Sequence, residues 1–219
     1  MGDLFNILQN NWSDYSSGFL MTCRLVVVSF LIAMGVGVFV GALRAFPNKW
    51  LNRVGLLYVE FFRNIPLLVL IYIVFDGLNR SGMNINAFTA GVMCLGLYTA
   101  AYIAEAVRSG VFAVGKGQGE AALSLGFSQR EVLTKIVLPQ ALRTVIPPIG
   151  NLIIAMIKNS AILGGSLLAL NDLLLRTRQI YNNNFKVETL VWSTIGYLIL
   201  TIAATIIVRR LETRLVIKR

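Results

Sequence analysis

Three stretches without a single charged residue most constrain what this chain can fold into. They run from Leu25 to Leu43, from Ser81 to Ala104 and from Thr189 to Val208, and contain 19, 24 and 20 residues. A helix needs about 20 predominantly apolar residues to cross the hydrocarbon core of a bilayer. The three stretches therefore predict membrane-spanning helices and exclude an ordinary soluble domain.

Two further segments are apolar but contain isolated charges. The first carries Glu60 and Arg63 near its start, and the second carries Arg143 early and Lys158 late. Counting both as membrane helices, the sequence predicts an all-α membrane protein with five transmembrane helices. The expected spans are residues 19–43, 54–78, 85–107, 136–163 and 188–208.

The distribution of basic residues predicts how the five spans are oriented. Cytoplasmic connections carry an excess of Lys and Arg. Twelve basic residues fall on one side, and they are Arg44, Lys49, Arg53, Arg108, Lys116, Arg130, Lys135, Arg209, Arg210, Arg214, Lys218 and Arg219. The other side has four, and they are Arg80, Arg176, Arg178 and Lys186. We therefore expect the N-terminus outside, with residues 1–18 as an extracytoplasmic tail, and residues 209–219 as a basic cytoplasmic tail.

Composition excludes several classes of function. The chain is 56% hydrophobic and 14% charged, has a net charge of +10 and contains no His. Without His we expect no metal site, no catalytic residue and no His-based acid/base chemistry. The basic residues follow membrane boundaries rather than forming a basic and aromatic patch, so we expect no nucleic-acid partner. Cys23 and Cys94 lie in apolar sequence and are expected to be small buried hydrophobes rather than a disulfide.

Two local patterns concern helix packing. Gly37 and Gly41 form a small-xxx-small pattern, which lets helix backbones approach closely. Pro147 and Pro148 lie inside the expected fourth span, where proline removes hydrogen bonds and kinks a helix. Broken helices at membrane depth are tolerated beside protein or a cavity. The fourth span is therefore either a helix that lines a pathway or a helix with a structural kink.

The longest connection, residues 109–139, has the composition of ordered structure. A helix is expected to begin near Glu120 and to end at Gly126. Ser128 followed by Glu131 matches a capping box and predicts the start of a second helix, which enters the membrane at Pro139. Such a short helix could lie on lipid, brace the bundle or dock into a partner.

The same connection resembles the EAA loop of ABC-importer permease subunits. The pattern EAA-x3-G-x9-I-x-LP is met at every fixed position, namely Glu120, Ala121, Ala122, Gly126, Ile136, Leu138 and Pro139. Three further segments, FFRNIPLLV (61–69), residues 102–122 and residues 138–160, resemble the polar amino-acid uptake branch of the binding-protein-dependent transport permease family. The resemblance covers roughly residues 15–215. One departure is Ser160-Ala161 after Lys158-Asn159, where many members of this branch have Thr-Ser or Ser-Ser.

The resemblance implies a fold, partners and a mechanism. It implies a type I ABC-importer permease fold over residues 19–208, in a bacterial inner or plasma membrane. The helix near Glu120 would be a coupling helix that docks on a separate cytoplasmic ATPase, where ATP and Mg are bound. The other implied partners are a second permease, either another copy or a homologous chain, and an extracytoplasmic amino-acid-binding protein. ATP-driven closure of two ATPases would switch the bundle between inward- and outward-facing states.

No nucleotide site is expected in the chain itself. The glycine-rich GKGQGE (115–120) lacks the spacing of a P-loop and follows no predicted strand. The alternatives are a stand-alone secondary transporter or channel, and a membrane assembly subunit that transports nothing. Secondary transporters commonly carry internal repeats, and five spans do not divide into two equal halves.

Ionisable and polar residues near membrane depth are the candidates for the substrate pathway or gate. Glu60 with Arg63, and Glu105 with Arg108, are spaced to pair on one helix face. Each pair could also simply stabilise a helix end. Lys158 with Asn159 lies deeper, where the Lys could contact a carboxylate or the binding protein, or could snorkel to the outer interface. Asn151 lies on the same predicted helix and could add a hydrogen bond.

Overall fold

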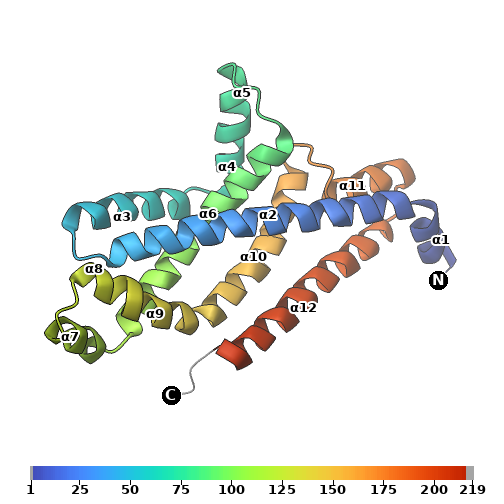
Figure 1. Cartoon of the computed structure of the whole chain (residues 1–219). Coiled ribbons are helices and arrows are strands. Elements are labelled where there is room, and N and C mark those ends of the chain that lie inside the picture. The colour runs from blue at the N-terminus through green and yellow to red at the C-terminus, as the bar shows by residue number, and fades with distance from the viewer. Residues whose placement is uncertain (1, 216–219) are drawn as a thin grey trace. The chain divides into compact units, whose positions relative to one another are not determined.

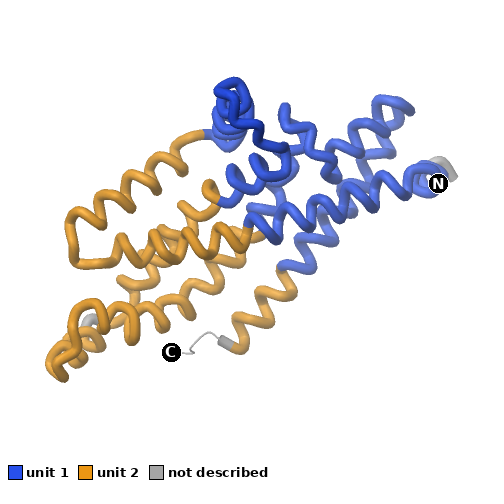
Figure 2. The backbone as a smooth tube through the Cα atoms, turned by 45° about the horizontal axis from the view of Figure 1, so that its top comes forward, with its two compact units in different colours: residues 1–29, 66–96, 154–204 blue, residues 30–65, 97–153, 205–219 orange. Residues whose placement is uncertain are grey.

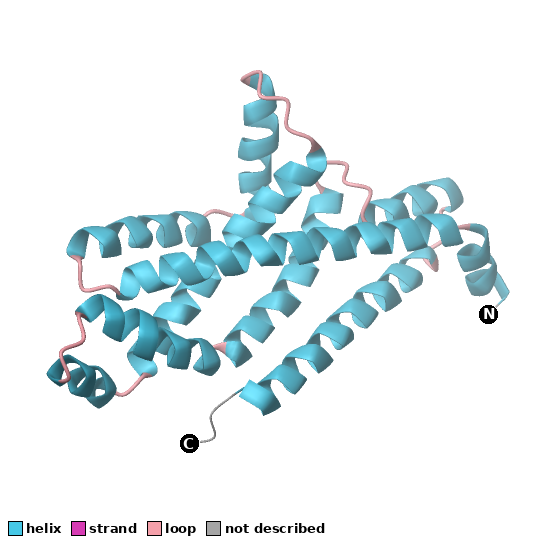
Figure 3. Cartoon of the chain, in the orientation of Figure 1, coloured by secondary structure: helices cyan, strands magenta, loops and turns pink. Residues whose placement is uncertain are grey.

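The computed structural model describes residues 2–215, without the side chains of residues 2, 3, 116 and 215. The last four residues of the expected basic tail, with Lys218 and Arg219, lie outside the described residues. Throughout the described part the secondary structure is helical, and no strand occurs there (Figures 1 and 3). This confirms the prediction of an all-α chain.

The α-helices are α1 (Gly2–Asn10), α2 (Trp12–Ala45), α3 (Lys49–Asn64), α4 (Leu67–Ile71), α5 (Leu78–Arg80), α6 (Ala87–Ala113), α7 (Lys116–Ser124), α8 (Gln129–Glu131), α9 (Leu138–Thr144), α10 (Ile146–Gly165), α11 (Leu173–Asn184) and α12 (Thr189–Leu215). Two π-helical stretches join neighbouring α-helices, and they are η1 (Tyr72–Gly77) and η2 (Val132–Val137). Most connections between these elements are short.

Within the described residues, four single helices are long and apolar enough to cross a bilayer. They are Trp12–Ala45, Ala87–Ala113, Ile146–Gly165 and Thr189–Arg214. The segments Lys49–Asn64 and Leu67–Arg80 reach the required length only when they are counted together as one broken span. The expected span 54–78 is therefore not a continuous helix. The break falls at Ile65–Pro66, because the residue before a proline avoids the helical conformation.

Two predicted boundaries differ from the structure. Most of the described part of the expected tail, from Gly2 to residue 18, is helical, and the first spanning helix already begins at Trp12. The fourth spanning helix begins at Ile146 rather than at residue 136, after an interruption at Val145. Pro147 and Pro148 explain this start, because they have no N–H to continue the preceding helix and are well tolerated in a first helical turn.

The chain divides into two compact units, which Figure 2 distinguishes by colour. Unit 1 comprises residues 1–29, 66–96 and 154–204. Its packing includes a cluster of Ile7, Tyr15, Leu173 and Ile180. Cys94 is buried and Cys23 is half-buried, and both are free thiols, which confirms that they form no disulfide.

Asp172 organises the start of α11 within unit 1. Its Oδ1 accepts the amide of Leu175 at 2.9 Å, which is the N-cap interaction expected of Asp. The side chain is fully buried, and Oδ2 has no hydrogen-bond partner among the described residues. Burial raises the pKa of Asp172 to about 6.

Unit 2 comprises residues 30–65, 97–153 and 205–219. Its α2 portion packs against α6 through the two glycines of the small-xxx-small pattern. A Cβ on Gly37 would lie 2.9 Å from the carbonyl oxygen of Ala100, and one on Gly41 would lie 2.8 Å from that of Ala104. Glycine is thus needed at both positions for the backbones to come this close, as predicted.

Candidate functional site

The EAA loop (residues 109–139) forms a helix, a tight turn and a second helix. Helix α7 ends in a Schellman arrangement, in which the amide of Phe127 donates to the carbonyl of Ala122 at 3.2 Å and that of Gly126 to the carbonyl of Leu123 at 3.0 Å. Gly126 has φ of +86°, a conformation that glycine adopts without steric cost. The predicted end of the helix at Gly126 is confirmed.

The second helix begins with the predicted capping box. The Ser128 hydroxyl accepts the Glu131 amide at 3.3 Å, and a Glu131 carboxylate oxygen accepts the Ser128 amide at 3.1 Å. Lys135 adds an ion pair with Glu131 at 2.8 Å. The pKa of Glu131 is lowered to about 2, mostly by the hydrogen bond from Lys135 and to a smaller extent by those from Ser128. The turn is therefore fixed by residues within one helical turn of each other.

The start of the first helix differs from the prediction. Helix α7 begins at Lys116 with Gly115 at the N-cap, so Glu120 lies in the second turn rather than in the first. Glu120 and Ala121 are exposed, whereas Ala122 is buried. Helix α7 packs against η2, where Val132 and Leu133 are also buried. The small size of Ala122 thus serves packing within the loop, while Ala121 stays accessible.

Helix α7 presents exposed apolar side chains beside Ala121. Leu123 is 47% exposed and Leu125 is 78% exposed. Leu138 is half-buried and Pro139 is exposed at the start of α9. Proline has no N–H to donate to the carbonyl of residue 135, which accounts for the π-helical stretch η2 directly before it.

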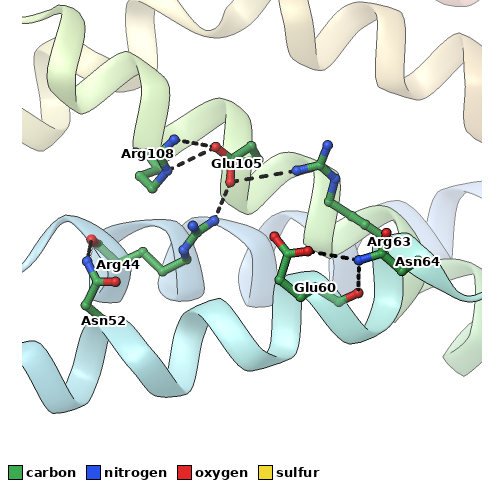
Figure 4. Close-up of polar contacts among 7 residues, drawn as sticks. All are labelled: Arg44, Asn52, Glu60, Arg63, Asn64, Glu105 and Arg108. Atoms are coloured by element: carbon green, nitrogen blue, oxygen red, sulfur yellow. Dashed lines mark hydrogen bonds and ion pairs between the residues drawn. The ribbon is translucent and has the colours of Figure 1, made fainter.

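A second site in unit 2 is a cluster of charged side chains around Glu105 (Figure 4). Glu105 Oε1 accepts hydrogen bonds from Arg108 Nε at 3.0 Å and Nη2 at 2.5 Å, which confirms the predicted pair. Glu105 Oε2 pairs with Arg44 of α2 and lies 3.9 Å from Arg63 Nη1 of α3. Three guanidinium groups thus surround one carboxylate, which leaves an excess of positive charge.

The predicted pairing of Glu60 with Arg63 is wrong. Glu60 is exposed and accepts a hydrogen bond from the Asn64 side chain at 2.9 Å instead (Figure 4). Arg63 turns toward α6, where its guanidinium carbon lies 5.4 Å from the centre of the Tyr102 ring. The aromatic face and the Glu105 carboxylate together attract the guanidinium more than the solvated Glu60 does.

Arg44 is the member of this cluster that the sequence prediction missed, because it was counted only as a topological charge. A signal was present in the sequence. Residues 37, 41 and 44 follow the i, i+4, i+7 spacing of one helix face. Since Gly37 and Gly41 place that face against α6, Arg44 is brought to α6 as well.

A groove of about 530 Å³ lies beside the cluster in unit 2. Its lining includes Arg63, Tyr102, Glu105, Ser109, Thr144 and Asn151. Helix α6 meets the α9–α10 junction closely at Gly110, where a Cβ would lie 3.2 Å from the carbonyl oxygen of Ala141. The groove therefore brings Arg63, Glu105 and Asn151 together from three segments.

Lys158 and Asn159 belong to unit 1 and are not among the residues that line the groove. Lys158 is exposed, and it forms no ion pair with a carboxylate in the described part of the chain. Asn159 is half-buried. Among the described residues, no group of three or more His, Cys, Asp or Glu side chains could hold a metal ion.

Comparison with known proteins shows similarity over nearly the whole chain. Residues 33–217 match the family described as binding-protein-dependent transport system inner membrane component. The chain is 40% identical over 211 residues to the probable glutamine ABC transporter permease protein GlnM of Bacillus subtilis, covering 96% of this chain and 97% of that protein. It is 39% identical to the glutamate/aspartate import permease protein GltJ of Escherichia coli, covering 67% and 65% of the two chains.

The fold is likewise similar to that of a solved transporter. A chain in the crystal structure of an amino acid ABC transporter with histidines superposes with a TM-score of 0.85 and 32% sequence identity. The superposition covers 95% of this chain and 97% of that one.

Proposed function

Because the chain belongs to the family of binding-protein-dependent transport system inner membrane components, we propose that it is the membrane-spanning subunit of an ATP-driven importer for a polar amino acid. One observation carries this proposal: similarity over almost its full length to a protein named as a glutamine permease. The names of the glutamate/aspartate permease and of the solved amino acid transporter support the same substrate class. The proposed location is the bacterial inner or plasma membrane.

The EAA loop is proposed to couple the permease to a separate ATPase, which binds ATP and Mg. Helix α7 offers what a docking helix needs, with Glu120 and Ala121 exposed and Leu125 apolar and uncovered. Gly126 fixes the turn, and Leu138 with Pro139 starts the helix that continues toward the membrane. Movement of α7 by the ATPase would be passed along the helix from α8 to α9 into the bundle.

In this proposal the N-terminus lies outside, and the EAA loop and the basic tail that begins at residue 209 lie in the cytoplasm. The excess of Lys and Arg on that side supports the orientation. Two permeases, either copies of this chain or homologous chains, would enclose the pathway, and a binding protein would deliver the amino acid from outside. Alternating exposure of the pathway to the two sides would carry the amino acid inward.

The groove beside Glu105 is proposed to be part of the pathway. Its open lining combines a guanidinium, a carboxylate, a hydroxyl and an amide, from Arg63, Glu105, Ser109 and Asn151. These groups can bind the ammonium, carboxylate and polar side chain of an amino acid through charge-assisted hydrogen bonds. Arg108 orients Glu105, and Glu60 lies one turn before Arg63 on α3.

The coupling proposal is tested with two substitutions in the EAA loop. Glu120→Lys reverses an exposed charge on α7, and Gly126→Asp forces a side chain into a left-handed backbone conformation. We expect both variants to lose co-purification with the ATPase, or amino-acid-stimulated ATP hydrolysis, in the reconstituted importer. Gly117→Ala is the control, because nothing lies within 4 Å of a Cβ there. Full coupling in both variants would contradict the proposal.

Lys158 and Asn159 of α10 are proposed as further candidates for a pathway or gate. The support is an exposed Lys inside a helix that qualifies as membrane-spanning. We expect Lys158→Ala to lower the rate or affinity of uptake while assembly in the membrane stays normal. Unchanged uptake would show that Lys158 only snorkels to the interface.

A further inference from the structure

We propose that Arg44 is a positioning residue for the groove. Its guanidinium holds Glu105 against the groove wall and adds to the positive charge of the groove, and it does not contact the amino acid. The inference rests on the proposed function, since it assumes that the groove is part of the amino-acid pathway. It assigns a role to Arg44 of α2, which belongs neither to the EAA loop nor to the groove lining.

Burial separates Arg44 from the other two arginines of the cluster. The Arg44 side chain is 8% exposed, whereas those of Arg63 and Arg108 are 39% and 31% exposed. Arg63 lines the groove, but Arg44 does not. Arg44 therefore reaches Glu105 from behind the groove wall, where a solute cannot contact it.

Helix α3 provides a fitted space for the Arg44 side chain. A Cβ on Gly55 would lie 2.5 Å from Arg44 Cγ and 3.3 Å from Cδ, distances too short for any residue but glycine without displacing the stem. One turn earlier, the Asn52 side chain donates a hydrogen bond to the Arg44 carbonyl at 2.7 Å (Figure 4). Gly55 and Asn52 thus fix both the side chain and the backbone of Arg44.

The two oxygens of Glu105 are held by different arginines. Arg108 takes Oε1, and Arg44 takes Oε2, to which Arg63 lies at 3.9 Å without a hydrogen bond. Because Arg44 already occupies Glu105 Oε2, this oxygen does not draw Arg63 out of the groove. Removing the Arg44 charge changes the cluster from three cations and one anion to two cations and one anion.

This charge balance predicts an effect on selectivity. Arg44→Gln makes the groove less positive, so a cationic amino acid should bind better and an anionic one worse. In a protein environment a unit charge a few ångströms away changes such a ratio by roughly tenfold or more. A residue with a purely structural role would instead change the affinity for all amino acids together.

The test measures dissociation constants of glutamate, glutamine and arginine for the purified permease–ATPase complex, by equilibrium dialysis without binding protein. We expect Arg44→Gln to shift the glutamate-to-arginine ratio of dissociation constants by roughly tenfold toward arginine. Arg44→Lys should keep the wild-type ratio. Arg53→Gln, an exposed position on α3, is the control.

A wild-type ratio in Arg44→Gln, or an equal change of the ratio in Arg44→Lys, would overturn the proposal. If Arg44→Gln does not assemble, Gly55→Ala provides the second test, because it displaces the Arg44 stem and leaves every charge in place. The proposal then requires a changed ratio, and an unchanged ratio overturns it. Failure of the proposed function is recognised separately, as a lack of ATP-driven amino-acid uptake by the intact wild-type importer.

Discussion

The EAA loop and the Glu105 cluster belong to the same unit but are stabilised in different ways. In the EAA loop, the hydrogen bonds that shape the turn join residues three to five positions apart, such as Ser128 with Glu131. In the Glu105 cluster, the part-buried contact joins Arg44 and Glu105, which are 61 positions apart. The loop is thus held by exposed local bonds, and the cluster by burial between helices.

This difference determines how each site responds to change. An exposed local bond can be replaced by water, so its loss costs little and its effect stays within the turn. When a cationic partner is removed, a carboxylate held between helices is left with an uncompensated negative charge, and the helices that meet there lose a contact. We therefore expect substitutions in the cluster to weaken the whole unit, and substitutions in the loop to loosen only the loop.

The largest expected effect is that of Arg44→Gln on stability. The change removes the least exposed of the three arginines around Glu105 and leaves Arg108 and the more distant Arg63. Breaking a buried ion pair destabilises by on the order of 3 kcal/mol. The measurement is the thermal unfolding midpoint of the purified permease in detergent. Arg53→Gln, which removes an exposed guanidinium stacked near Trp50, should cost much less. Equal effects of the two substitutions would show that burial of Arg44 between helices does not add to the stability of unit 2.

A smaller effect is expected at Gly126. Gly126→Ala puts a residue with a Cβ at a position whose backbone is left-handed, which costs about 1–2 kcal/mol. This cost should appear as faster amide exchange across the turn from α7 to α8. The matched control is Gly117→Ala inside α7, where the same change should slow exchange because alanine favours a helix by about 1 kcal/mol over glycine. Destabilisation of unit 2 as a whole by Gly126→Ala would show that the loop is not an independent local unit.

The same contrast explains how much could be predicted from the sequence. The end of α7 at Gly126 and the cap at Ser128 were predictable, because their signals lie next to the structure they form. The spanning helices were predictable in type but less so in extent, since hydropathy does not register the breaks at Ile65 and Val145. The start of α7 at Lys116 was missed, because Gly115 gives a weaker signal than Glu120 did.

The cluster required knowledge of which helices meet. The i, i+3 spacing correctly paired Glu105 with Arg108 but wrongly paired Glu60 with Arg63, although the spacing is identical. The deciding factor is the neighbouring helix, which brings Tyr102 and Glu105 within reach of Arg63. Only the Gly37–Gly41 pattern, extended by one turn to Arg44, carried information about that contact in the sequence.

A still smaller effect is expected from Ser128→Ala, which removes the N-cap of α8. Loss of such a cap costs about 1 kcal/mol, and it should raise the amide exchange rate of Glu131 and its neighbours. Ser124→Ala is the matched control, because the Ser124 hydroxyl donates only to the Glu120 carbonyl within α7. No difference between the two serines would mean that packing of α7 on η2, rather than the cap, sets the turn.

The smallest effect concerns the pH dependence of the same turn. The pKa of Glu131 is lowered to about 2 by Lys135 and Ser128, whereas a free glutamate titrates near 4.3. A carboxylate with a lowered pKa in the folded state stabilises fully above the unfolded value and loses that contribution as pH falls toward 2. Amide protection of residues 128–135 should therefore be constant from pH 7 to about 5 and decrease below that.

In Glu131→Gln the protection should be lower at neutral pH and should not change over the same range, because no titrating group remains in the cap. A wild-type loop whose protection is independent of pH down to 3 would show that the capping box contributes nothing through charge, and that the EAA loop, like the cluster, is held by packing.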